Sequence, residues 1–136
     1  MRMHYSLGLA AVMSMAAVAA HGQPPQAARP TVTPILTQPL PEFPGKEGLV
    51  LTVDYPPGGS SPLHHHDAHA FVYVLEGSVV MAVQGGKEVT LTPGQTWTEK
   101  PGDVHTVSRN ASQTAPAKFV VFFLKDAGKP AVIPGP

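Results

Sequence analysis

The chain has no cysteine among its 136 residues. Disulfides, cysteine-ligated zinc, iron–sulfur clusters and thiol nucleophiles are therefore excluded together. Charge is also scarce, since only 13% of residues are charged and nine basic residues balance nine acidic ones. A neutral chain lacks the basic surface that polyanions require, so we expect no nucleic-acid partner. This length fits one domain, because two would each be too small to bury a useful core.

Long apolar runs are also rare, and the most prominent one lies at the start of the chain. Residues 7–20 (LGLAAVMSMAAVAA) are apolar or small, but the run is too short for a comfortable membrane span of about 20 residues. It is typical of the apolar region of a secretory signal peptide. We expect residues 1–22 to be that peptide, cleaved after Ala19, Ala20 or Gly22, and the mature protein to be periplasmic or secreted without a stable membrane anchor. The alternative is a retained amphipathic or anchoring helix.

Proline and glycine, in contrast, are abundant, with 16 and 13 residues. Seven of the prolines lie between residues 24 and 44, a density that forbids a helix and favours extended chain. We therefore expect a Pro-rich N-terminal arm at residues 23–47, a folded domain at 48–126 and an extended C-terminal tail at 127–136.

Between residues 48 and 126 the sequence predicts short strands separated by turns. Leu49 to Tyr55 alternates so that Leu49, Leu51, Val53 and Tyr55 share one face. Gly85-Gly86 is typical of a hairpin turn. Further strands are predicted at 70–75, 79–84, 87–92, 96–99, 104–108 and 117–125. Several short strands of this kind, with no helical period between them, favour an all-β sandwich or barrel.

Histidine carries the strongest functional signal, since four of the seven histidines lie between residues 64 and 69. His64 and His66 are two residues apart, so both imidazoles point to the same side of an extended segment. His105 follows a Pro-Gly-Asp turn that can aim it into the same cavity. Three neutral imidazoles suit Zn, Cu, Fe or Ni and leave coordination positions open. The alternative is a solvated loop that binds nickel only adventitiously.

Two groups of residues resemble the two motifs of the cupin family. Gly58, His64-x-His66 and the run from Tyr73 to Gly77 resemble the first motif; Gly94, the run from Pro101 to His105, and Asn110 resemble the second. The resemblance covers residues 48–125. It implies a double-stranded β-helix, the jelly-roll barrel of two facing antiparallel sheets, here with extended Pro-rich arms at both ends. It also implies that His64, His66 and His105 bind one divalent transition metal.

The chain departs from the cupin pattern at position 70, where Ala70 replaces the glutamate that completes the family's ligand set. We expect three ligands, with His69 as an alternative fourth if a bulge re-aims it; Asp67 lies in the turn. Without the carboxylate the preference for Mn weakens, and Zn, Fe, Cu or Ni is expected. The alternative is a degenerate site that has lost its metal.

The remaining expectations concern function and assembly. Resemblance to small cupins implies a metalloenzyme, dioxygenase-like or isomerase/lyase-like, acting on a small oxygenated organic molecule; the alternative is a non-catalytic protein that binds a small ligand or a metal. We expect Val72, Trp97 and Val107 to line the substrate cavity. Glu99 is an acid/base candidate near the metal, but an exposed strand end is favoured for it. Exposed sheet edges and apolar faces predict a homodimer.

Overall fold

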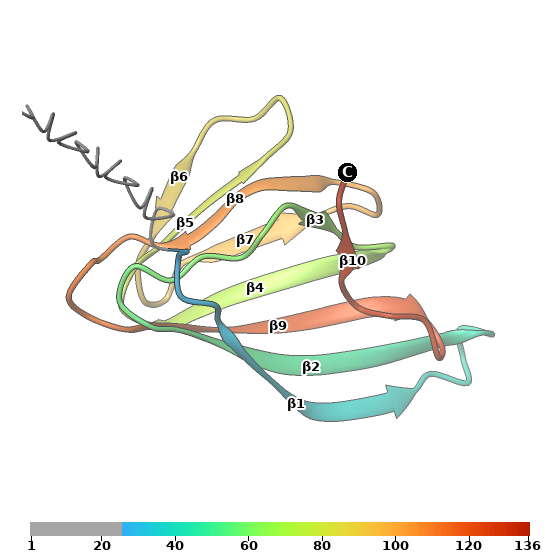
Figure 1. Ribbon diagram of the computed structural model, residues 1–136. Helices are drawn as coiled ribbons and strands as arrows, with labels where there is room; N and C mark the ends of the chain where they lie inside the picture. Colours follow the sequence, from blue (N-terminus) through green and yellow to red (C-terminus); the bar gives the residue numbers. More distant parts are fainter. Residues whose placement is uncertain (1–25) are drawn as a thin grey trace, which may run out of the picture.

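The computed structural model describes residues 26–136, so the expected signal peptide lies outside the described residues. Within this range the chain forms β-strands and no α-helix (Figure 1). The strands are β1 (Thr31–Pro39), β2 (Lys46–Tyr55), β3 (His64–His65), β4 (Ala68–Glu76), β5 (Val79–Val83), β6 (Val89–Leu91), β7 (Thr96–Glu99), β8 (Val104–Asn110), β9 (Ala117–Asp126) and β10 (Ile133–Pro134). No helix in residues 26–136 is long and apolar enough to cross a membrane.

The strands form two five-stranded antiparallel sheets, in the orders β1-β2-β9-β4-β7 and β10-β3-β8-β5-β6. Figure 1 shows β2, β9 and β4 side by side in one layer and β5, β6 and β8 in the other. Neighbours within each sheet are often far apart in sequence, as β2 and β9 are, and this is the arrangement of a jelly roll. The all-β double-stranded β-helix expected from the sequence is confirmed.

The core lies between the sheets and follows the alternation of the long strands. In β9 the side chains of Phe119, Val121 and Phe123 are buried, while those between them are more exposed. β4 shows the same period, with Val72 and Val74 buried. A strand with one buried face requires this alternation, because successive side chains point to opposite sides.

Three strands were not predicted, and each has a local reason. β1 lies in the Pro-rich segment and pairs antiparallel with β2, with a bulge between Pro34 and Leu36. It is an edge strand, where proline is tolerated because one side of the backbone needs no partner. β3 and β10 have only two residues each and pair with one another. Strands this short carry no periodic signal, yet they bring the end of the chain to His64 and His65.

Candidate metal centre

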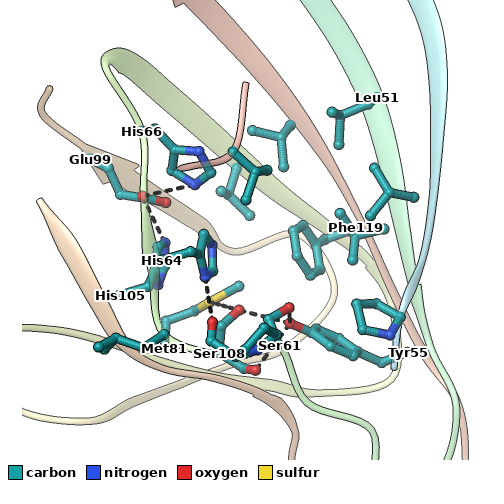
Figure 2. A pocket seen from close by; sticks show the side chains of 18 of the residues that line it. Leu51, Tyr55, Ser61, His64, His66, Met81, Glu99, His105, Ser108 and Phe119 are labelled. Atoms are coloured by element: carbon teal, nitrogen blue, oxygen red, sulfur yellow. Dashed lines mark hydrogen bonds and ion pairs between the residues drawn. The ribbon is translucent and has the colours of Figure 1, made fainter. Parts of the chain in front are cut away.

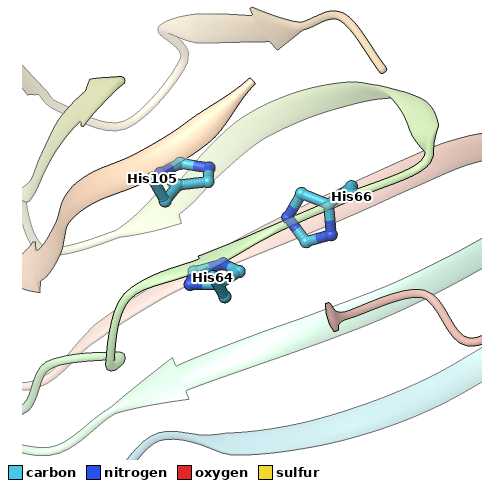
Figure 3. Close-up of side chains that lie close together, drawn as sticks. All are labelled: His64, His66 and His105. Atoms are coloured by element: carbon cyan, nitrogen blue, oxygen red, sulfur yellow. The ribbon is translucent and has the colours of Figure 1, made fainter. Parts of the chain in front are cut away.

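The three histidines predicted as ligands meet in the barrel interior. His64 and His105 are directly paired across β3 and β8, and their rings stack with centroids 4.8 Å apart. The His66 ring lies 5.0 Å from that of His64 and 5.8 Å from that of His105. Figure 3 shows His64 and His66 on one segment and His105 on the neighbouring strand. One ring nitrogen from each residue lies within 4.8 Å of the others, and all three side chains are buried.

Backbone carbonyls fix the orientation of two of these rings. His64 Nδ1 donates to the carbonyl of Pro62 at 2.7 Å, and His66 Nδ1 donates to the carbonyl of Ala131. Because a carbonyl only accepts, these Nδ1 atoms carry the ring protons and leave the Nε2 lone pairs free. Metal-binding histidines are commonly held in this way. For His105 the corresponding contact, to the carbonyl of Val107, is long at 3.5 Å.

Burial keeps the rings of His64 and His66 neutral. Removal from water lowers the pKa of His64 and of His66 below the usual 6.5 for histidine, because a buried imidazolium loses its hydration. Both imidazoles are therefore uncharged at neutral pH, with their one ring proton on Nδ1. A neutral imidazole is the form that binds a metal ion.

A fourth polar side chain enters the site from the opposite sheet. Glu99, at the end of β7, has Oε2 at 2.7 Å from His105 Nε2 and 3.6 Å from His66 Nε2 (Figure 2). It is only 4% exposed, so the expectation of an exposed strand end is wrong. The signal was present in the sequence, since Glu99 shares strand parity with Trp97 and a tryptophan side chain favours the inner face.

Chemically, these residues fit a transition-metal ion. Three imidazoles and a carboxylate are donors that such ions prefer. Although His105 Nε2 is close, no group among residues 26–136 is aligned to donate a hydrogen bond to Glu99 Oε2. Buried polar atoms are nearly always bonded, so a cation among these four side chains would supply the missing interaction.

The histidines open onto a cavity of about 240 Å³ with a largely apolar wall. The wall includes Leu51, Val53, Val72, Met81, Phe119, Val121 and Phe123. Opposite the histidines the Tyr55 hydroxyl lies 2.6 Å from Ser61 Oγ and 2.8 Å from Ser108 Oγ (Figure 2). The cavity is therefore apolar along its wall and polar at both ends.

Five other residues are candidates for the site on the sequence. Val72 is one of the lining residues, whereas Trp97 packs against the core and Val107 is half-buried, both outside the lining. The His69 side chain is exposed, and it lies outside the group formed by His64, His66 and His105. Asp67 is exposed as well. Of these five, only Val72 lines the cavity.

Comparison with known proteins places this geometry in a family. The family model of the cupin domain matches residues 51–123. No curated protein sequence matches the chain. A double-stranded β-helix protein from Klebsiella pneumoniae is 20% identical, with a TM-score of 0.62 over 82% of this chain and 90% of that one.

Two further solved structures illustrate the range of similar proteins. A cupin domain from Bordetella pertussis is 23% identical, with a TM-score of 0.58 over 75% of this chain and 99% of that one. An oxalate oxidase in complex with the substrate analogue glycolate is 25% identical, with a TM-score of 0.57 over 76% of this chain and 54% of that one. The matched segment contains the three histidines and spans more than half of the sequence. The chain belongs to the cupin family.

Proposed function

We propose that this protein is a metal-dependent enzyme that acts on a small oxygenated organic molecule held in the barrel. One divalent transition metal would be bound by His64, His66 and His105. The observation that carries the proposal is the convergence of these buried imidazoles, with the Nδ1 atoms of His64 and His66 bonded to carbonyls, on a largely apolar cavity. Such a bound metal supplies a Lewis acid or a redox centre for an oxygen-bearing substrate group.

The chain's own residues define what such a substrate looks like. A cavity of about 240 Å³ has room for about eight water molecules at roughly 30 Å³ each, hence for a molecule with on the order of ten non-hydrogen atoms. The apolar wall around Phe119 and Val121 favours a partly apolar molecule. Arg29 lies at this cavity as well, so a negatively charged group on the substrate would meet a cation there.

Two reaction classes fit this site, namely dioxygenase-like chemistry and isomerase or lyase chemistry. Structures with this fold include an oxidase, the oxalate oxidase described above, and a lyase. A DMSP lyase from Ruegeria pomeroyi is 22% identical, with a TM-score of 0.56 over 64% of this chain and 42% of that one. This similarity concerns the fold and does not identify the reaction, so we use it only to choose which reactions to assay. The assays must therefore distinguish oxygen consumption from a reaction that needs no oxygen.

The test is turnover by the mature chain loaded separately with Fe, Cu, Ni, Zn or Mn. Substrates would include oxalate, catechols, flavonols, enediols and dimethylsulfoniopropionate, with oxygen uptake and product formation recorded in parallel. We expect activity with at least one pair of metal and substrate, lost in His66→Ala and kept in His69→Ala, whose side chain is exposed. Stoichiometric metal binding without turnover across the panel would favour a non-catalytic binding protein instead.

We also propose that the protein is exported, on the strength of the apolar run at residues 7–20. In a bacterial host, the full chain should appear outside the cytoplasm with a new N-terminus after Ala19, Ala20 or Gly22. Intact Met1 in a cytoplasmic fraction would contradict export.

A homodimer is proposed from the outer face of the first sheet. Phe71 and Phe122 stack there with ring centroids 5.9 Å apart, and Phe71, Tyr73, Leu75 and Phe122 are between 38% and 47% exposed. A row of exposed large apolar side chains on adjacent strands is typical of an interface, and a second copy presents the same row. Light scattering should give a dimer mass for the wild type and a monomer for Phe71→Ser/Phe122→Ser. A wild-type monomer would contradict the proposal.

A further inference from the structure

We propose that Glu99 is the carboxylate ligand of the metal centre, supplied by β7 because β4 carries Ala70 where the family pattern has glutamate. This inference rests on the proposed metal site and makes it a centre with three histidines and one glutamate. The sequence alone favoured three histidines, with His69 as the alternative fourth.

The sheet register places Glu99 beside the missing residue. Ala70 and Glu99 are directly paired across β4 and β7. Directly opposed residues in antiparallel strands point to the same face, with Cβ atoms about 4.5–5.5 Å apart. A glutamate side chain can span that distance, so a carboxylate rooted at position 99 reaches the space that one rooted at position 70 would occupy.

Packing around Ala70 leaves that space to Glu99. Ala70 is fully buried and lies between Glu99 on β7 and Phe123 on β9. The Phe123 ring in turn packs on His66, with centroids 4.8 Å apart. A small residue at position 70 therefore accommodates a large aromatic on one side and an inward carboxylate on the other.

Electrostatics favour a cation beside this carboxylate. Within residues 26–136 its only ionisable partners at ion-pair distance are His66 and His105, and no lysine or arginine pairs with it. An isolated buried carboxylate is costly. A divalent ion held between Glu99 and the histidines would neutralise it and bond to Oε2, which accepts no hydrogen bond from the described residues.

The added carboxylate changes which metals suit the site. Three imidazoles alone favour Zn, Cu, Ni or Fe, whereas a carboxylate oxygen also suits Mn. It also contributes one negative charge close to the ion.

The test measures binding of Co²⁺ and Zn²⁺ alone, without substrate, to the chain from Gln23 to Pro136. Affinity comes from competition with a chromophoric chelator, and the Co²⁺ absorption bands report the ligand set. The variants are Glu99→Gln, Glu99→Ala and Ala70→Glu/Glu99→Ala. Glu88→Gln is the matched control, because Glu88 is an exposed carboxylate that pairs with Arg109 on the surface. Thermal unfolding of each metal-free variant checks the fold, and Glu99→Gln preserves the side-chain volume.

We expect Glu99→Gln and Glu99→Ala to bind metal at least about tenfold more weakly, the lower end of what loss of even an outer partner costs, and to shift the Co²⁺ bands. Glu88→Gln should match the wild type, and Ala70→Glu/Glu99→Ala should regain affinity by returning the carboxylate to the family position. Unchanged affinity and bands in both Glu99 variants would overturn the inference while leaving the three-histidine site standing. Weaker binding with unchanged bands would also overturn it, because Glu99 would then act from outside the ligand set. A wild type that binds neither ion would refute the proposed metal site itself.

Discussion

The last six residues of the chain should contribute to metal affinity although none of them is a predicted ligand. The carbonyl of Ala131 accepts the Nδ1 proton of His66, and that of Gly135 accepts from His65 Nδ1 at 3.1 Å. The backbone nitrogen of Gly135 also donates to the carbonyl of Leu63 at 3.0 Å. Ending the chain after Pro130 removes all three hydrogen bonds and the pairing of β10 with β3. The His66 ring then loses the contact that fixes its orientation.

The size of the effect follows from these contacts. Loss of an outer partner of a metal-binding histidine costs about 10–100-fold in affinity, or about 1.4–2.8 kcal/mol. Three hydrogen bonds at about 1 kcal/mol each would lower the free energy of unfolding of the metal-free protein by about 3 kcal/mol at most, because β10 lies at the surface. The two losses can be measured separately.

The assay compares the wild type, the chain ending after Pro130 and a control ending after Gly135. The control lacks only Pro136: it keeps the Ala131 carbonyl, and Gly135 still offers an acceptor oxygen, now in the terminal carboxylate. Chelator competition gives the metal affinity, and denaturant unfolding in EDTA gives the stability without metal. We expect weaker metal binding only in the shorter chain. Equal affinity in all three proteins would refute the idea that the tail orients His66.

Three other predictions follow from the same structure. Burial lowers the pKa of His64 and His66, so below about pH 6.5 the unfolded chain takes up protons that the native chain does not. The free energy of unfolding measured in EDTA and the metal occupancy should therefore both fall as the pH drops below about 6.5. Full occupancy at pH 4.5 would contradict a histidine site. Gly77→Ala should lower the thermal unfolding temperature more than Gly85→Ala. Both glycines have positive φ, of 67° and 79°, but of the two only Gly77 has a neighbouring carbonyl that an added Cβ would overlap. Equal losses in the two variants would refute that clash. Phe119→Ala should enlarge the cavity and lower the free energy of unfolding, measured with denaturant, by about 3–5 kcal/mol. A loss below about 1 kcal/mol would mean that the barrel collapses into the space left by the phenyl ring.

Much of the barrel could be predicted from the sequence because its strands alternate clearly. β7 lies at the predicted residues 96–99, and β9 extends the predicted strand by one residue. The grouping of His64, His66 and His105 followed from the spacing of two residues and from the turn before His105. In these segments a local pattern specifies which way each side chain points.

The rest depends on contacts between distant residues. Glu99 was expected at an exposed strand end, because a charged residue beside a turn is usually solvated. Strand parity with Trp97 indicates the direction of the side chain, but its burial beside the histidines is decided by pairing with Ala70, on a strand that no local pattern connects to it. The role of Ala131 is similar, since a carbonyl 65 residues after His66 accepts its ring proton. Every residue type has a backbone carbonyl, so the sequence could not show that the carbonyl of Ala131 is the acceptor.

The most direct test of the metal centre is the metal content of the untagged chain that begins at Gln23, measured by elemental mass spectrometry. We predict about one transition-metal ion per chain, lost in His64→Ala, His66→Ala and His105→Ala and retained in His69→Ala. A folded wild type that holds no metal, even after reloading, would contradict the account.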